Sequence, residues 1–358
     1  MAGSRRLGMP AGLQMAPGHR ATTPGLLAGL VALACVVTVA LVYATLEVPR
    51  WLVRVARDWV DIPDYHPAIE PEAIVAFLDS SLIRPIGYAC LAVVLALVVA
   101  GLLTRRSRLA SAGAVLLFLP TVGACAGYMF FLAGLGVLRA LWLPAWSGWM
   151  ALGDIAYLPY IAIVWPFSLT GVDARGGVAL GSIALGLFIL VSSTTAWFLA
   201  RFEGRPVADV WLYRVSRHPQ YLGWLVWSWG FMLLSAQQPI PMAGENPGAA
   251  LPWLVGSLAI VAVAWAEEAR MLREHGPEYA AYRERTAFLV PLPQWLRRAA
   301  GAPVRFVLRK DAPETGRDAL IAFLATLGLA VLASLPFLLA DWPPGGWWAW
   351  PQWGLTPL

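Results

Sequence analysis

The sequence "LPWLVGSLAIVAVAWAEEARML" at residues 251–272 decides the fold class of this chain. It carries no charged residue from Leu251 to Ala266, and an apolar run of this length is typical of a membrane-spanning helix. The run ends in Glu267 and Glu268. Carboxylates at the end of a membrane helix are costly to desolvate, so they mark a site more often than not. The stretch therefore indicates a membrane protein and the place of its chemistry.

The composition of the whole chain agrees with a membrane protein. Of its 358 residues 59% are hydrophobic, 13% are charged and 19 are Trp, whereas about 25% of an ordinary globular chain is charged. The net charge of +5 does not indicate nucleic-acid binding, because the basic residues lie between apolar runs, where they set membrane orientation. Cys35, Cys90 and Cys125 lie inside apolar runs without the spacing of a zinc site. We expect neither a metal nor a nucleic-acid partner.

Apolar runs of about 20 residues recur along the chain, and each can cross a bilayer as a helix. They cover residues 24–46, 82–103, 110–138, 178–200, 219–236, 251–268 and 318–340. We therefore predict an all-α fold, a polytopic membrane helical bundle of about seven transmembrane helices.

The segment 142–169 is less regular, because it contains Asp154 and three prolines. The basic stretches 104–108 and 270–317 should lie on the cytoplasmic side. If the N-terminus is also inside, these sides agree only when 142–169 does not fully cross. We predict a broken or re-entrant segment packed against protein. The alternative is a different number of helices within 109–143.

Composition divides the chain into four parts. Residues 1–23 are expected to form a cytoplasmic tail, and residues 24–200 carry the N-terminal transmembrane helices. Residues 201–297 form a charged–apolar–charged module. Residues 298–358 hold a linker, the last transmembrane helix and a Trp-rich tail, which is typical of an interfacial anchor.

Within the module, "SRHPQYLGW" at residues 216–224 predicts a helix start. Pro219 suits the first turn, because the N–H that it lacks has no helical partner there. Arg217 and His218 then lie at the positive end of the helix, where free N–H groups and the two side chains can bind a carboxylate or phosphate. The alternative for Arg217 is a membrane anchor that reaches the lipid headgroups.

The two glutamates cannot serve one ligand equally, because adjacent helical residues point about 100° apart. We expect one of Glu267 and Glu268 to face a pocket and the other to pair with a basic side chain such as Arg270 or Arg273. The alternative is that both lie in water past the edge of the bilayer.

The third stretch, "REHGPEYAAYRERTAFLVP" at residues 273–291, predicts a break and a new helix. Gly276 ends the helix of the glutamates and Pro277 begins the next one. Tyr279, Tyr282 and either Arg283 or Arg285 then recur on one side of a short amphipathic helix. We expect this helix to lie on the cytosolic surface as a lid over the pocket.

In this order, "RHPQYLG", the Glu pair and "GPEYAAYRER" resemble the isoprenylcysteine carboxyl methyltransferase and phospholipid methyltransferase superfamily. These are integral-membrane enzymes that use S-adenosylmethionine. The resemblance covers about residues 205–295. The chain departs from the family pattern at His275, where Phe is common, and at Thr286–Ala287, where Val-Pro is common, so the acceptor side is less well defined than the cofactor side.

The resemblance implies a cofactor pocket between two membrane helices and the segment after them. The implied cofactor-binding residues are Arg217, His218, Pro219, Tyr221, Leu222, Gly223, Glu267, Glu268 and Tyr279. Arg217 and His218 would hold the methionine carboxylate, and one of the two glutamates would bind the amino group or the ribose. Gly223 would let the cofactor approach the helix closely. The implied catalytic residues, with Arg285 near the acceptor, are Arg285, Tyr282 and Glu268.

The implied reaction transfers a methyl group from S-adenosylmethionine to a lipophilic or small acceptor with a carboxylate, amine or thiol. Besides this acceptor, the expected partners are membrane lipids, and the expected location is the inner (plasma) membrane with the active site facing the cytoplasm.

Two other classes stay open. One is an NADPH-dependent sterol-type membrane reductase, although Gln220 and Trp224 stand where its motif has Asn and Glu. The other is a non-catalytic transporter or scaffold, because broken helices also occur in transporters.

Overall fold

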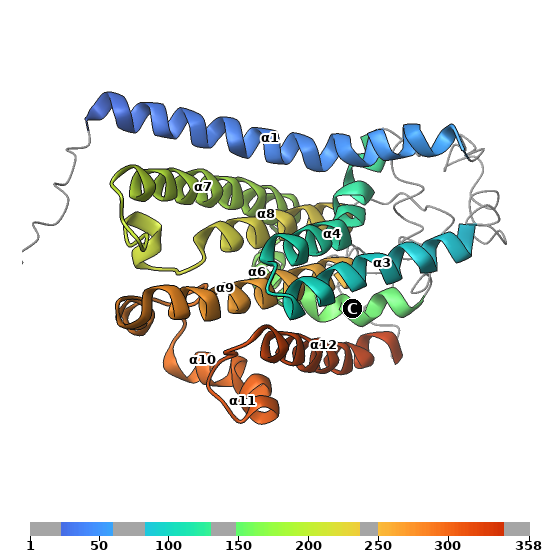
Figure 1. Ribbon diagram of the computed structural model, residues 1–358. Coiled ribbons are helices and arrows are strands. Elements are labelled where there is room, and N and C mark those ends of the chain that lie inside the picture. Colours follow the sequence, from blue (N-terminus) through green and yellow to red (C-terminus); the bar gives the residue numbers. More distant parts are fainter. Residues whose placement is uncertain (1–22, 60–82, 130–147, 237–249, 340–358) are drawn as a thin grey trace, which may run out of the picture.

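The computed structural model of the chain describes residues 23–59, 83–129, 148–236 and 250–339 (Figure 1). Over these ranges the chain is all-α, as predicted, with no β-strand and one isolated parallel bridge between Ser216 and Ala287. Its helices are α1 (Pro24–Arg57), α3 (Ile83–Leu103), α4 (Ser107–Met129), η2 (Gly148–Tyr157), α6 (Leu158–Ser168), α7 (Arg175–Phe202), η3 (Trp211–Arg214), α8 (Pro219–Ala236), α9 (Ala250–Arg285), α10 (Gln294–Ala300), α11 (Ala302–Leu308) and α12 (Gly316–Leu339).

Within the described residues, each predicted apolar run falls on one of these helices, and residues 130–138 of the third run lie outside them. In the part of the chain that the structure describes, five helices are long and apolar enough to cross a membrane, namely α1, α3, α7, α9 and α12. The other two predicted runs form α4 and α8, and the predicted start of α8 at Pro219 is confirmed. The chain is therefore a helical membrane bundle, as its composition indicated.

The segment predicted to be broken is broken. Its described part consists of the 3-10 helix η2 followed by the 11-residue helix α6, with Pro159 in the first turn of α6. The segment packs against protein, because a Cβ at Gly153 would lie 2.2 Å from the backbone nitrogen of Leu251. The backbone N–H of Ile155 also donates to Ser334 Oγ of α12 at 3.2 Å.

The described helices stack in the order α1, α7, α8, α9 and α12, so that α8 lies inside the bundle (Figure 1). Small residues bring α7 and α8 into close contact. A Cβ at Gly186 would lie 2.3 Å from the backbone nitrogen of Trp227, and one at Gly223 would lie 2.9 Å from that of Leu190. The Trp227 ring packs against Trp224 with centroids 5.0 Å apart. This tight pair of helices fixes where the first residues of α8 lie.

Helix α9 carries the predicted break. Gly276 has φ 48° and ψ −124°, a left-handed conformation that favours glycine, and the helix resumes at Pro277 and ends at Arg285. The chain then returns to the start of α8, where the Arg217 N–H donates to the Ala287 carbonyl at 2.8 Å. The kink therefore folds the end of α9 back over the N-terminus of α8.

Two further sequence predictions concern the linker before the last helix and the two ends of the chain. The helix α10 straddles the predicted boundary between the module and the linker at residues 297–298, and the linker also contains α11. Trp295 of α10 and Phe306 of α11 are exposed. The N-terminal tail at 1–22 and the Trp-rich tail at 340–358 lie outside the described residues.

Candidate functional site

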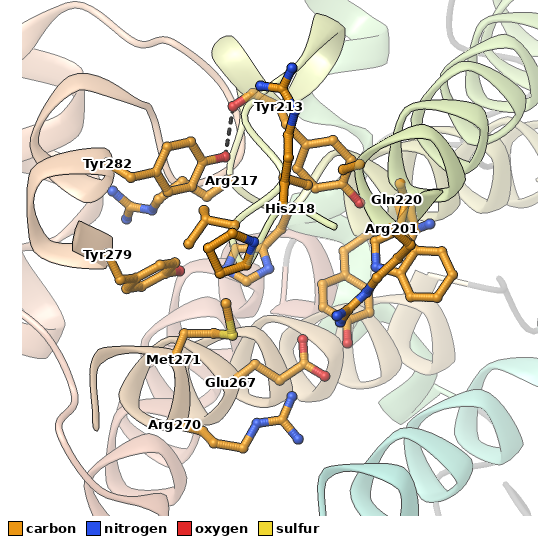
Figure 2. A pocket seen from close by; sticks show the side chains of 17 residues that line it. Arg201, Tyr213, Arg217, His218, Gln220, Glu267, Arg270, Met271, Tyr279 and Tyr282 are labelled. Carbon is orange, nitrogen blue, oxygen red and sulfur yellow. Dashed lines mark hydrogen bonds between the residues drawn. The ribbon is translucent and has the colours of Figure 1, made fainter. Parts of the chain in front are cut away.

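A cavity of about 330 Å³ opens where α7 ends, α8 begins and α9 kinks. Its walls come from Trp197 and Arg201 of α7, from residues 205–208, from η3, from the start of α8 and from α9 on both sides of Gly276. Figure 2 shows Tyr279 and Tyr282 on one side of this space and Arg201 and Gln220 on the other, with Glu267 and Arg270 rising from the helix beneath. The three sequence motifs thus meet at one cavity.

The start of α8 contributes the residues that its motif predicted. Arg217 and His218 directly precede Pro219, and both line the cavity. The His218 ring stacks on Tyr221 with centroids 5.6 Å apart and meets the Phe288 ring edge-on at 5.2 Å. The ring is therefore held in place from both sides.

Arg217 is already engaged by the protein. Its Nε donates to Glu268 Oε1 at 2.5 Å, and its Nη1 donates to the carbonyls of Arg283 at 2.7 Å and Thr286 at 2.9 Å. Three of its five N–H bonds are thus used to hold the segment after the kink. The second glutamate pairs with a basic side chain, as expected, but the partner is Arg217 and not Arg270 or Arg273.

Glu268 lies in a buried cluster of charges. Its side chain is 4% exposed, and its oxygens lie 3.3 Å from His218 Nε2 and 3.6 Å from Arg283 Nε, besides Arg217. It does not line the cavity, whereas Glu267 does. Glu267 also lies near the Tyr221 hydroxyl. Of the two glutamates, Glu267 faces the cavity.

Of the residues predicted on the lid, two line the cavity and one does not. Tyr279 and Tyr282 are buried and line the cavity, and the Tyr282 hydroxyl donates to the Tyr213 carbonyl at 2.6 Å. The Arg285 side chain is 63% exposed, lies over the Tyr282 ring and pairs with Asp209 at 3.5 Å. The structure therefore places Arg285 outside the cavity wall.

Other residues expected at the cofactor also lie outside the wall. Pro219 is buried at the first position of α8, and neither Pro219 nor Leu222 lines the cavity. Gly223 faces α7, where Leu190 and the Gly186 carbonyl fill the place of a side chain. The structure thus gives Gly223 a role in helix packing, and not in the approach of a ligand.

Several lining residues were not predicted from the sequence. Arg201 comes directly after a predicted membrane run, and its guanidinium lies over the Trp197 ring at 5.3 Å. Arg205 enters from the following loop and is paired with Glu203 at 2.6 Å and Asp209 at 2.9 Å. The only sequence signal was the cluster of charges after the apolar run at 178–200, which a membrane boundary also explains.

Burial tunes the polar wall of the cavity. Burial of Tyr213 in η3 raises the pKa of its phenol above the ordinary value, which disfavours the phenolate further. Within the described ranges, no three His, Cys, Asp or Glu side chains cluster closely enough to hold a metal ion. The wall therefore offers cationic, carboxylate and aromatic groups to a ligand.

Comparison with known families finds a match over the part of the chain that forms this site. A family model matches residues 183–286, a range that holds every lining residue of the cavity, and its family is related to steroid 5-alpha reductase/methyltransferase-like membrane proteins. That family is described as "Protein of unknown function (DUF1295)". No curated protein and no solved structure matches the chain.

Proposed function

We propose that this chain is a membrane-embedded methyltransferase that moves a methyl group from S-adenosylmethionine to a lipophilic or small acceptor. One observation carries the proposal: Arg217 and His218 at the start of α8, Glu267 of α9 and the tyrosines after Gly276 line a single cavity. These are the segments whose order resembles the methyltransferase superfamily. If these segments had faced separate spaces, they could not have formed one binding site.

The groups in the wall suit each part of S-adenosylmethionine. The arginine and histidine side chains suit its carboxylate, and the Glu267 carboxylate suits its ammonium group or ribose hydroxyls. The faces of Tyr221 and Tyr279 suit the sulfonium cation, because aromatic rings attract cations. When bound, the cofactor supplies an activated methyl group, which the acceptor attacks in line with the bond to sulfur.

The task of the protein is then to position the reactants. Alignment of two reactants can account for about 7–11 kcal/mol of a barrier, so methyl transfer needs little covalent help. The Arg217–Glu268 pair fixes the segment after the kink, which holds Tyr279 and Tyr282 against the cavity. This arrangement sets polar and aromatic groups around the cavity, and positioning of this kind needs no metal.

The related reductases make an NADPH-dependent reductase the second candidate. The size of the cavity favours the methyltransferase over the reductase. About 330 Å³ is at the lower end of the range of about 300–1,000 Å³ for small-molecule sites, which suits one nucleoside better than a dinucleotide. Trp224, which stands where the reductase pattern has Glu, is 6% exposed and packs against Phe118 in the core.

Ligand-dependent stability separates the two candidates. Purified protein in detergent is heated with S-adenosylmethionine, with S-adenosylhomocysteine or with NADPH. A ligand at 100 times its dissociation constant should stabilise the native state by about 2.7 kcal/mol. We expect this for the two sulfur nucleotides. Stabilisation by NADPH alone would favour the reductase, and no response to any of the three would remove the proposal.

A further inference from the structure

Two arginines in the cavity lie outside every motif. Arg201 lies in the last turn of α7, and Arg270 follows Glu267 by about one turn of α9. Both line the cavity, and Figure 2 shows their side chains reaching toward the space around the Glu267 carboxylate from different helices. Because Glu267 and Arg270 are three residues apart on a helix, their side chains are neighbours on one face.

These two arginines differ from the other cations around the site. Arg205, Arg217 and Arg283 each lie within 4 Å of a carboxylate that is at most 9% exposed. In contrast, among the described residues Arg201 has only the Trp197 ring as a charge-stabilising neighbour, and the carboxylate near Arg270 is Glu274 at 3.9 Å. Both guanidinium groups can therefore accept an anionic ligand without breaking a buried pair.

The motif arginine lacks this freedom. The Arg217 side chain is 10% exposed, and three of its N–H bonds go to Glu268 and to two backbone carbonyls. A ligand carboxylate that took over these bonds would leave Glu268 buried without its main partner, which is costly. The anion of a ligand is therefore better held elsewhere in the cavity.

We infer that Arg201 and Arg270, together with Glu267, form a subsite for the α-amino-acid end of the nucleotide. The two guanidinium groups bind the carboxylate, and the Glu267 carboxylate binds the neighbouring ammonium group. Arg217 is instead a positioning residue, which holds the segment after Gly276. This inference rests on the proposed function, and it changes which residues hold the carboxylate.

The test compares two ligands that differ only at this end. S-adenosylhomocysteine has the amino-acid group, whereas 5′-methylthioadenosine lacks it. We expect Arg201→Gln and Arg270→Gln each to weaken S-adenosylhomocysteine binding by about tenfold or more, because each removes charge-assisted hydrogen bonds. Binding of 5′-methylthioadenosine should change by less than about twofold, which also shows that the variants are folded. Arg273→Gln, on the same helix but outside the cavity, is the matched control for both ligands.

The possible results separate two failures. If the unaltered protein binds neither nucleotide, the proposed function fails and the subsite fails with it. If it binds S-adenosylhomocysteine and both variants bind it equally well, only the subsite is wrong. An equal loss for both nucleotides would also overturn the subsite, since the arginines would then act on the nucleoside or on the shape of the cavity.

Discussion

The buried pair between Arg217 and Glu268 gives the sharpest prediction. In Glu268→Gln the Arg217 charge stays buried, at 10% exposure, but loses its carboxylate. Breaking a buried ion pair by removing one partner costs about 3–5 kcal/mol. We expect a loss near 3 kcal/mol in the free energy of unfolding, because the glutamine oxygen can still accept the Arg217 hydrogen bond.

The assay is equilibrium unfolding in mixed detergent micelles, followed by tryptophan fluorescence. Glu274→Gln is the matched control, since Glu274 lies on the same helix with its side chain 54% exposed. It should lose less than about 0.5 kcal/mol. In Arg217→Met the carbonyls of Arg283 and Thr286 also lose their donor. A double variant should therefore show a coupling of about 1–3 kcal/mol with Glu268→Gln. A loss below about 1 kcal/mol for Glu268→Gln, or no coupling, would refute a stabilising role of the buried Arg217–Glu268 ion pair.

Two further predictions concern packing and the lid. In Gly186→Ala the new Cβ would meet the backbone of Trp227 at 2.3 Å, so we expect the same unfolding assay to show a loss of about 1–3 kcal/mol. Gly181→Ala on the same helix, with nothing within 4 Å of its Cβ, should leave stability unchanged or raise it by up to about 1 kcal/mol, and equal losses in both would contradict the close packing of α7 and α8. Tyr282→Phe removes the 2.6 Å hydrogen bond to η3 and should cost about 1–3 kcal/mol, whereas Tyr279→Phe should cost less; the reverse order would place the lid contact wrongly.

Local features of the fold were predictable because their causes are local. Apolar runs indicate membrane helices wherever they occur, and Pro219 at a helix start and Gly276 at a break follow from backbone sterics alone. The meeting of the three motifs was also predictable, but only through the resemblance, since no local rule brings residues of α8 next to the far end of α9.

Roles that depend on partners could not be predicted. The side chains of Arg217 and Glu268 are 51 residues apart in the chain, so the sequence could not show that they neutralise each other. Gly223 looked like a place for a ligand, yet the packing of α7 against it fills that space. Nothing in the sequence singled out Arg201, because a charge after an apolar run has the same sequence pattern at a membrane boundary and at a binding site.

The sequence by itself determined that this protein is a helical membrane bundle, and where one helix starts and another breaks. Hydrophobicity and backbone conformation are properties of short stretches, and they act before any distant contact forms. Only the tertiary structure decided which glutamate faces the cavity and which is buried in the ion-pair cluster. That choice depends on how α9 is rotated against α8 and on where the kink returns the chain, and neither is written in a short stretch of sequence.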